Sequence, residues 1–383
     1  MHDAEGDGAG ALEKDEDLLS AGGSKGVAGE QRGSKILHKA MRAAAAARPA
    51  IIADVLAVDT PRKTIIFTNT KLETVTLAAE LGGKVAAAGG PGDMGSCLVL
   101  HGDLPQFQRT RVMDDFKRCA QGVLIATDVA ARGIHIQDLD LVIHCGVPLS
   151  TSGAARRAKT SKAEVVNSEQ FIHRTGRTGR MGAGGTSILL FDPTAGEAAL
   201  LPVLERVIGG TFEFADAPQV GARLRAAGNL AKRRISAVPD EAARLFEQDA
   251  QALLDEHGPL ALARALAALG GLAQPLAPRS LLDGRDGVVT ICAHPRTTQV
   301  QEHAEGGNGE VRAVTPSDVT EELRERLGVK KIGRVSLCAD GSAVVDLPEP
   351  QAQVLLTGPP PSSSAISRFS APEALPRLKG GKQ

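Results

Sequence analysis

The sequence predicts an α/β protein in which a parallel sheet covered by helices is followed by a helical stretch and a small α+β domain. The first observation is that short apolar runs alternate with helix-period stretches throughout Ile36–Phe191. The second is that Ala195–Gly271 carries helical patterns. After these, Pro275 and Pro278 open a third region with the order strand, helix, hairpin, helix, which is typical of a two-layer sandwich.

The first region is expected to form one parallel sheet. Its apolar run Val123–Ala126 is unbroken, which suits a strand covered on both faces, and strand–helix alternation implies right-handed crossovers between parallel neighbours. The predicted strands are Ile36–Arg42, Thr64–Thr68, Cys97–His101, Gly122–Thr127, Asp140–His144 and Thr186–Phe191. The predicted helices are Ile51–Val58, with Pro49 where a first-turn proline is tolerated, Lys71–Leu81 and Gln106–Arg118.

Further elements are predicted after the sheet region, and the whole chain divides into five predicted parts. The elements are helices Glu197–Val207, Glu241–Glu256 and Leu260–Leu269, strand Gly287–Ala293, helix Val319–Leu327, hairpin strands Arg334–Cys338 and Ala343–Leu347, and helix Pro350–Leu356. The parts are a disordered acidic and Gly-rich tail (1–34), the sheet domain (35–194), a helical extension suited to packing or dimerisation (195–275), the α+β domain (276–357) and a disordered Pro/Ser-rich tail (358–383).

Composition excludes several classes of protein. The chain has 383 residues, 42% of them hydrophobic, but its nine Phe are the only aromatic residues besides His, so it does not work mainly by stacking ligands on aromatic platforms. A net charge of -1 confines any nucleic-acid site to a local patch. The five cysteines form no CxxC, which argues against a disulfide framework or a zinc site. No apolar run reaches the ~18 residues of a membrane span, and the acidic start is unlike a targeting signal.

The most informative segment is His173–Arg180, in which three arginines recur at a spacing of three. They are Arg174, Arg177 and Arg180, separated by Gly and Thr. Charges this dense are rarely buried unpaired, and the arginine fork matches phosphate oxygens in a two-pronged way. A solvated basic helix end is the plain alternative, but the neighbouring strand Thr186–Phe191 places the segment at the edge of a folded core. The pattern therefore predicts a site for a strongly anionic ligand.

Three further polar segments follow predicted strands directly. They are Ile65–Thr70, His101–Arg109 and Ala126–Ile134. The carboxyl ends of parallel strands meet at one edge, and open α/β sheets bind ligands there. We therefore expect these segments to lie on one rim of the sheet.

In this order and at these distances, the four segments resemble the motifs of the second RecA-like lobe of DEAD-box RNA helicases. The resemblance covers about Lys35–Pro193. Ile65–Thr70 is similar to motif IV, Gly102 with Gln106 and Arg109 to the Gln-x-x-Arg segment, Ala126–Gly133 to motif V, and His173–Arg180 to motif VI. Phe246–Gly271 resembles the extension that follows the helicase lobes in the nucleolar RNA helicase 2 subfamily, and Leu281–Pro348 resembles its RRM-like GUCT domain.

The resemblance implies one half of a split ATPase. In the family, ATP and RNA bind between two lobes, and the first lobe carries the phosphate loop and the Mg²⁺-holding acidic motif. By motif, Arg177 and Arg180 would be catalytic arginine fingers on the γ-phosphate, and Arg174 would bridge to the first lobe. The implied ATP-binding and interdomain residues are Gly133, His135, Arg174, Arg177 and Arg180. The implied RNA-binding residues are Asn69, Gly102, Arg109 and Thr127, and no metal ligand is expected in this chain.

Three departures from the family pattern bear on activity. The family has Asp at the position of His135, where it accepts from the ATP ribose; a neutral His can accept at one ring nitrogen, but a protonated one cannot. Leu149–Ser168 is longer than the usual link and is open to reading as a phosphate-contacting loop, a solvated insertion or a gene-prediction error. No Gly-x-x-x-x-Gly-Lys-Ser/Thr loop occurs in the chain.

The sequence is therefore interpreted as the C-terminal portion of an ATP-dependent RNA helicase that lacks its N-terminal lobe and is inactive alone. Its expected partners are RNA, a DEAD-box N-terminal lobe in cis or in trans, and a second copy of the chain, and no membrane. The alternative is a non-catalytic RNA-binding or scaffold protein derived from a helicase. The resemblance suggests the nucleus or nucleolus, with a plastid or mitochondrion as the alternative.

Overall fold

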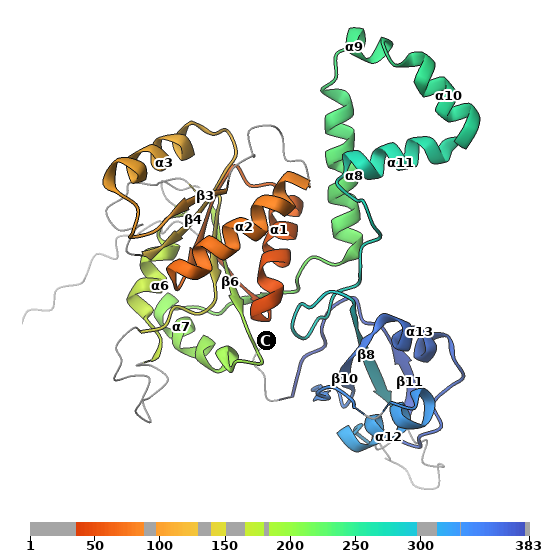
Figure 1. Ribbon diagram of the computed structural model, residues 1–383. Helices are drawn as coiled ribbons and strands as arrows, with labels where there is room; N and C mark the ends of the chain where they lie inside the picture. Colours follow the sequence, from red (N-terminus) through yellow and green to blue (C-terminus); the bar gives the residue numbers. More distant parts are fainter. Residues whose placement is uncertain are drawn as a thin grey trace, which may run out of the picture. The chain divides into compact units, whose positions relative to one another are not determined.

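The computed structural model describes residues 36–87, 97–128, 139–150, 165–179, 184–296, 312–329 and 331–379 (Figure 1). The predicted N-terminal tail 1–34 lies outside the described residues. So do residues 151–164, which make up most of the long link before the arginine-rich segment.

The first region forms one parallel sheet, as the alternation of strands and helices predicted. Its strands run in the order β3-β4-β2-β5-β6-β1-β7, and every pairing between neighbours is parallel. The strands are β1 (Ile36–Arg42), β2 (Lys63–Thr68), β3 (Cys97–Leu100), β4 (Gly122–Thr127), β5 (Leu141–Cys145), β6 (Gly185–Phe191) and β7 (Glu213–Ala215). The six expected strands are confirmed within two residues at each end, and the short edge strand β7 was not predicted.

Helices cover both faces of this sheet. The helices are α1 (Arg48–Asp59), α2 (Lys71–Ala87), α3 (Gln106–Arg118), α6 (Ser168–Thr175) and α7 (Leu201–Ile208). Because side chains alternate along a strand, Ile66 packs in the cluster that α1 and α2 complete, whereas Phe67 packs with Phe116 of α3. Phe171 of α6 and Leu204 of α7 form a further cluster with strand side chains of β1 and β6. Burial on both faces explains the unbroken apolar runs.

The register of the strands brings their carboxyl ends level. Thr68 at the end of β2 lies opposite Thr127 at the end of β4, and Ala126 lies opposite Leu100 at the end of β3. The segments that follow these three strands therefore leave the sheet at one rim, as expected from the sequence.

A helical extension follows the sheet. It consists of α8 (Val220–Ser236), α9 (Asp240–Arg244), α10 (Glu247–His257) and α11 (Pro259–Leu269). The helix predicted over Glu241–Glu256 is interrupted between α9 and α10 at Leu245 and Phe246, both largely exposed. The sequence patterns missed α8, because its Gly, Ala and Arg residues leave few apolar positions at helical spacing.

In its described residues, the third region is a four-stranded antiparallel sheet with two helices. Its elements are β8 (Val288–Pro295), α12 (Pro316–Leu327), β9 (Ser336–Leu337), β10 (Ala343–Pro348), α13 (Glu349–Thr357) and β11 (Ile366–Ser370), and the strand order is β11-β8-β10-β9. The prediction of a disordered tail from Gly358 was wrong as far as Lys379. Pro and Ser composition suggested disorder, but Ile366 is fully buried and β11 pairs with β8.

The sheet face that α12 and α13 leave open is covered by two other segments of the chain. Leu281 from one side and Leu375 from the C-terminal segment pack against Cys292, Cys338 and Val344. The C-terminal segment also forms backbone hydrogen bonds with the β9 hairpin, at 2.7 Å in each of two places. The face on which an RRM-like domain would stack bases is therefore occupied by the protein itself.

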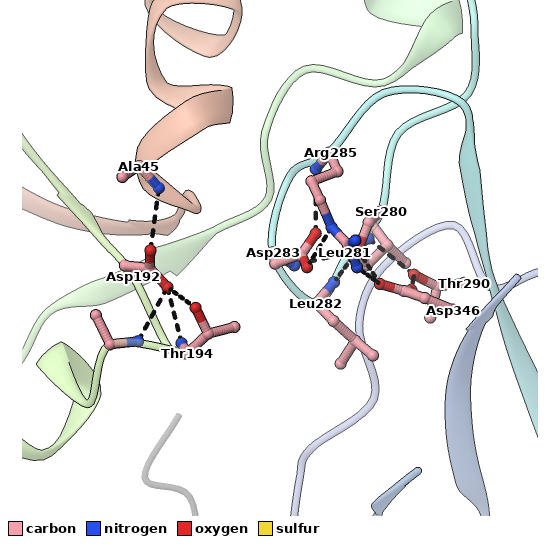
Figure 2. Close-up of polar contacts among 11 residues, drawn as sticks. Ala45, Asp192, Thr194, Ser280, Leu281, Leu282, Asp283, Arg285, Thr290 and Asp346 are labelled. Atoms are coloured by element: carbon pink, nitrogen blue, oxygen red, sulfur yellow. Dashed lines mark hydrogen bonds and ion pairs between the residues drawn. The ribbon is translucent and has the colours of Figure 1, made fainter. Parts of the chain in front are cut away.

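Polar contacts fix the first of these covering segments (Figure 2). The Ser280 hydroxyl donates to Asp346 at 2.6 Å, and the Thr290 hydroxyl donates to the other carboxylate oxygen at 2.7 Å. Thr290 also accepts from the Leu281 N–H at 2.8 Å. Burial raises the pKa of Asp346, although both hydroxyl donors oppose the shift.

A second carboxylate anchors the end of β6 to the chain that leads into α1. Asp192 accepts from the Ala45 N–H at 3.0 Å and from the Thr194 hydroxyl at 2.6 Å (Figure 2). Burial alone would raise the pKa of Asp192, but these bonds and the N–H groups of Thr194 and Ala195 outweigh it and lower the pKa. This contact sets the start of α1 against the sheet.

Candidate functional site

The arginine-rich segment His173–Arg180 begins in the last turn of α6 and continues beyond it. The Asn167 side chain caps the start of the helix by accepting from a first-turn N–H at 3.0 Å. The helix ends at Gly176, whose N–H bonds back to a carbonyl one turn earlier at 2.8 Å. Arg174 therefore belongs to the helix, whereas Arg177 follows it.

Arg174 points into the domain, and only 1% of its side chain is exposed. Its Nε and Nη2 donate to the two carboxylate oxygens of Asp128, each at 2.6 Å, in a two-pronged ion pair. Nη2 also donates to Asn69 Oδ1 at 3.0 Å. The guanidinium carbon lies 5.3 Å from the centre of the Phe67 ring. Nη1 has no acceptor among the residues that the structure describes.

These contacts join three segments that are distant in sequence. Asp128 follows β4, Asn69 follows β2, and Arg174 lies in α6, 46 and 105 residues away respectively. The Asn69 amide also donates to the Val147 carbonyl at 3.0 Å, so both ends of this side chain bond within the domain. The segments that resemble motifs IV, V and VI thus meet at one guanidinium group.

A buried histidine of β5 packs against α6. The ring of His144 in β5 stacks on Phe171 with 4.6 Å between centroids, and its Nε2 lies 3.0 Å from the Ser187 hydroxyl. Burial lowers the pKa of His144 well below its usual value, and the nearby charge of Arg174 acts in the same direction. The ring is therefore neutral near pH 7 and serves as a packing surface for the helix.

The chain after α6 is held against the start of β6. Thr178 donates its hydroxyl to the Leu139 carbonyl and forms a parallel bridge with that residue. Gly179 has a φ of 69°. A Cβ on Gly185 would lie 2.1 Å from Thr178 Oγ1 and 2.6 Å from the Gly179 nitrogen, so this approach requires glycine.

The Gly102–Arg109 segment lies at the start of α3, and an ion pair between Lys71 and Asp103 ties it to the start of α2. The hydrogen bond from Lys71 lowers the pKa of Asp103. Arg109 Nη1 lies 3.4 Å from Gln106 Oε1, within the first turn of α3, and Gly102 is exposed. The segment therefore presents a basic side chain and open backbone at the same rim.

The predicted site residues have different surroundings. Asn69, Thr127 and Arg174 gather at the carboxyl ends of β2 and β4, with Thr127 only 7% exposed. Arg177 is half-buried just beyond α6. Arg174 is turned inward onto Asp128, whereas the motif resemblance has it reach across to another lobe. Three predicted residues lie outside the described ranges: Gly133, His135 and Arg180.

Sequence reasoning did not assign roles to two residues of this arrangement. Asp128 directly follows the predicted strand Gly122–Thr127, but its partner cannot be read from the sequence, because pairing over 46 residues depends on the register of the sheet. His144 could have been noticed as a histidine inside the apolar run Leu141–Cys145, where a polar ring needs a buried partner.

Neither a metal-binding cluster nor a membrane-spanning helix occurs in the ranges that the structure describes. No group of three or more His, Cys, Asp or Glu side chains in these ranges is placed to hold a metal ion. In the same ranges, no helix is both long and apolar enough to cross a membrane.

Comparison with known families matches two parts of the chain. Residues 47–182 match the family described as helicase conserved C-terminal domain. Residues 220–269 match the DDX21/DDX50 dimerisation domain. The first match covers the rim segments, and the second covers α8 to α11.

Among curated proteins, similar relatives are RNA helicases. The DEAD-box ATP-dependent RNA helicase 3B, chloroplastic, of Zea mays is 33% identical over 318 residues, which are 82% of this chain and 38% of that protein. Nucleolar RNA helicase 2-A of Xenopus laevis is 32% identical over 265 residues, which are 68% of this chain and 31% of the relative. The chain thus spans about a third of the length of these relatives.

A solved structure of the C-terminal domain of the DEAD-box protein Dbp5 shares 28% identity and covers 48% of this chain and 91% of that chain, with a TM-score of 0.39. The family assignment itself rests on the two domain matches and the relatives. Together with the parallel sheet and its aligned rim, the two domain matches show that this chain carries a helicase conserved C-terminal domain, similar to that of DEAD-box RNA helicases, joined to a DDX21/DDX50-type dimerisation domain.

Proposed function

We propose that this chain is the C-terminal part of an ATP-dependent RNA helicase, which closes over ATP and grips RNA when a DEAD-box N-terminal lobe, in cis or in trans, completes the cleft. The observation that carries the proposal is the contact of Arg174 with both Asp128 and Asn69. It fixes three motif-bearing segments relative to one another at the rim, and positioning is most of what a phosphoryl-transfer site requires of its protein.

The segment beyond α6 is proposed to contact ATP. Arg177 and Arg180 are the proposed arginine fingers, which offset negative charge on the phosphoryl group when ATP is bound. Gly133 and His135 are proposed to contribute to the ATP site, with Mg²⁺ held by the N-terminal lobe. We also propose that Arg174 bridges to an acidic group of that lobe; because only 1% of its side chain is exposed, this contact requires the guanidinium group to turn away from Asp128, and its buried Nη1 has no acceptor among the described residues to hold it.

Four residues along the rim are proposed to bind RNA. Asn69, Gly102, Arg109 and Thr127 are proposed to hold phosphates and sugars of one strand, a mode of binding that positions RNA without reading its bases. The chemistry at the exposed Gly102 and the half-buried Arg109 fits this role, since an open backbone and a guanidinium can both approach an anionic backbone closely.

The helical extension is proposed to mediate self-association of the chain. The extension matched to a dimerisation domain exposes large apolar side chains, including Leu245 (80%) and Phe246 (65%), which a second copy of the chain would bury. We propose a homodimer through this extension.

The nucleus or nucleolus is the proposed location, with a plastid or mitochondrion as the alternative, since relatives with chloroplastic and with nucleolar names both occur.

The test mixes the purified chain with a separately purified DEAD-box N-terminal lobe and measures RNA-stimulated ATP hydrolysis. We expect negligible hydrolysis by the chain alone, a clear rate for the mixture, and its loss with Arg177→Ala. RNA affinity should fall with Arg109→Ala and stay unchanged with Arg177→Ala. Equal losses of RNA affinity would contradict this division of roles, and robust ATPase by the chain alone would contradict its dependence on the other lobe. RNA binding without ATPase in any mixture would favour the non-catalytic RNA-binding or scaffold role.

A further inference from the structure

Helix α8 carries an unbalanced positive charge. Its seventeen residues include no Asp or Glu, and its basic residues are Arg223, Arg225, Lys232, Arg233 and Arg234. Of the two helices packed against it, α11 has no acidic residue, whereas α1 supplies Asp54, which pairs with Arg223. In a chain with a net charge of -1, this is a marked local excess of cations.

The five basic side chains fall into two sets. Arg223 is largely buried and pairs with Asp54 at 3.1 Å, and Arg234 donates to the Leu269 carbonyl at 2.6 Å. The remaining three, Arg225, Lys232 and Arg233, are exposed, and none of them forms an ion pair with any residue in the described ranges. The first set therefore builds the fold, and the second set has no structural partner there.

The exposed cations lie on one face of the helix. At 100° per residue, Arg225, Lys232 and Arg233 fall within about 100° of one another, with Asn229 and Ser236 between them. All five residues are exposed and all can donate hydrogen bonds. We call this set the α8 stripe. With a rise of about 1.5 Å per residue, Arg225 and Lys232 lie on the order of 10 Å apart along the helix axis.

The helix dipole explains only part of this pattern. Cations in the last turn of a helix interact favourably with the dipole, which accounts for Arg233 but not for Lys232, which lies before the last turn. Arg225 lies in the second turn, outside the last turn in which the dipole favours a cation, and it has no acidic residue one turn away to pair with. The stripe as a whole is therefore better explained by an external anion.

We propose that the α8 stripe binds the phosphate backbone of RNA, at a second site distinct from the rim. That the polyanion is RNA rests on the proposed function; that the stripe takes a phosphate backbone does not. Arginine forks and short polar donors are the side chains that contact nucleic-acid backbones. Protein interfaces instead place apolar residues at their centre and deplete charge there, and the exposed apolar residues Leu224 and Ile235 lie on a different side of α8. A second copy of the chain can therefore cover that side while RNA occupies the stripe.

The experiment titrates fluorescent single-stranded RNA with the whole chain at several salt concentrations. The test variant is Arg225→Gln/Lys232→Gln/Arg233→Gln. The matched control is Arg244→Gln/Arg264→Gln/Arg324→Gln, which removes the same charge from exposed arginines elsewhere. We expect the test variant to lose at least about tenfold in affinity at low salt, and the slope of log affinity against log salt to flatten by about 2, since each lost phosphate contact removes about 0.7. The control should change affinity less than twofold.

Other outcomes separate this site from the rim and from protein partners. The same loss in a background of Arg109→Ala supports an independent site even if the rim assignment fails. Equal affinity and slope in the wild-type chain and the test variant would overturn the proposal, as would no RNA binding by the wild-type chain at low salt. Tighter binding of a poly-glutamate peptide than of RNA, or loss of self-association by the test variant with RNA affinity intact, would assign the stripe to an acidic protein surface and also overturn it.

Discussion

Arg174 and Asp128 form a two-pronged ion pair, with both hydrogen bonds at 2.6 Å and only 1% and 12% of the two side chains exposed. The pair connects the last turn of α6 to the end of β4. Because the arginine also bonds Asn69 after β2, one side chain sets the relative positions of three segments at the rim. The inward turn of Arg174 is therefore a structural requirement for the site.

Removing this arginine should destabilise the domain strongly. Arg174→Ala leaves Asp128 without its partner, and breaking a buried ion pair from one side costs about 3–5 kcal/mol. Urea unfolding at pH 7 measures the free energy of unfolding. The control is Arg118→Ala, which breaks the exposed pair with Asp115 and should cost less than about 1 kcal/mol. Equal small losses for both variants would show that the pair contributes little.

Alanine substitutions at two adjacent glycines should differ sharply in their effect on stability. Gly185→Ala places a Cβ 2.1 Å from Thr178 Oγ1, so the segment after α6 or strand β6 must shift, at a cost of about 1–3 kcal/mol. Gly184→Ala meets nothing within 4 Å and is the matched control. Thermal unfolding distinguishes them, and a similar Tm for both variants would mean that the approach is looser than the distances imply.

The stability of the domain should fall in acid partly because of His144. Its pKa is lowered in the folded protein, so the folded state stays neutral while the unfolded state takes up a proton below its usual pKa of about 6.5. Stability is therefore lost as pH falls from 7 to 5, because in this range the unfolded state gains a proton that the folded state does not. His144→Gln should lose less over this range in urea unfolding.

The control for this effect is the exposed His173. His173→Gln should follow the wild-type dependence on pH. If His144→Gln shows the same loss between pH 7 and pH 5 as the wild-type chain, the buried ring is not responsible.

The C-terminal segment should contribute to the stability of the third region. Leu375 is 6% exposed and packs on the open face of the small sheet, so Leu375→Ala should cost about 2–4 kcal/mol. Leu356→Ala, at a position 37% exposed, should cost less than about 1 kcal/mol. Chemical unfolding compares the two, and a negligible effect of Leu375→Ala would show that the segment does not hold this face.

Much of the fold could be predicted, because strand and helix periods are local properties of the chain. The six apolar runs predicted six of the seven strands of the large sheet, and Gln106–Arg118 was predicted with its observed bounds. Composition was a poorer guide. The Pro/Ser-rich stretch after Gly358 suggested disorder. Strand β11 forms there because it pairs with β8 and because Ile366 is buried in the hydrophobic cluster of the small domain.

For the candidate site, residue types and their order along the chain are enough to predict which chemistry is present, since the arginine spacing and the strand-end segments are local features of the sequence. The tertiary structure decided which of these groups turn inward. Arg174 bonds a carboxylate 46 residues away because the sheet register and the packing of α6 on Phe171 and His144 bring them together. Local spacing cannot encode such a pairing, because the distance between two side chains depends on how separate elements pack.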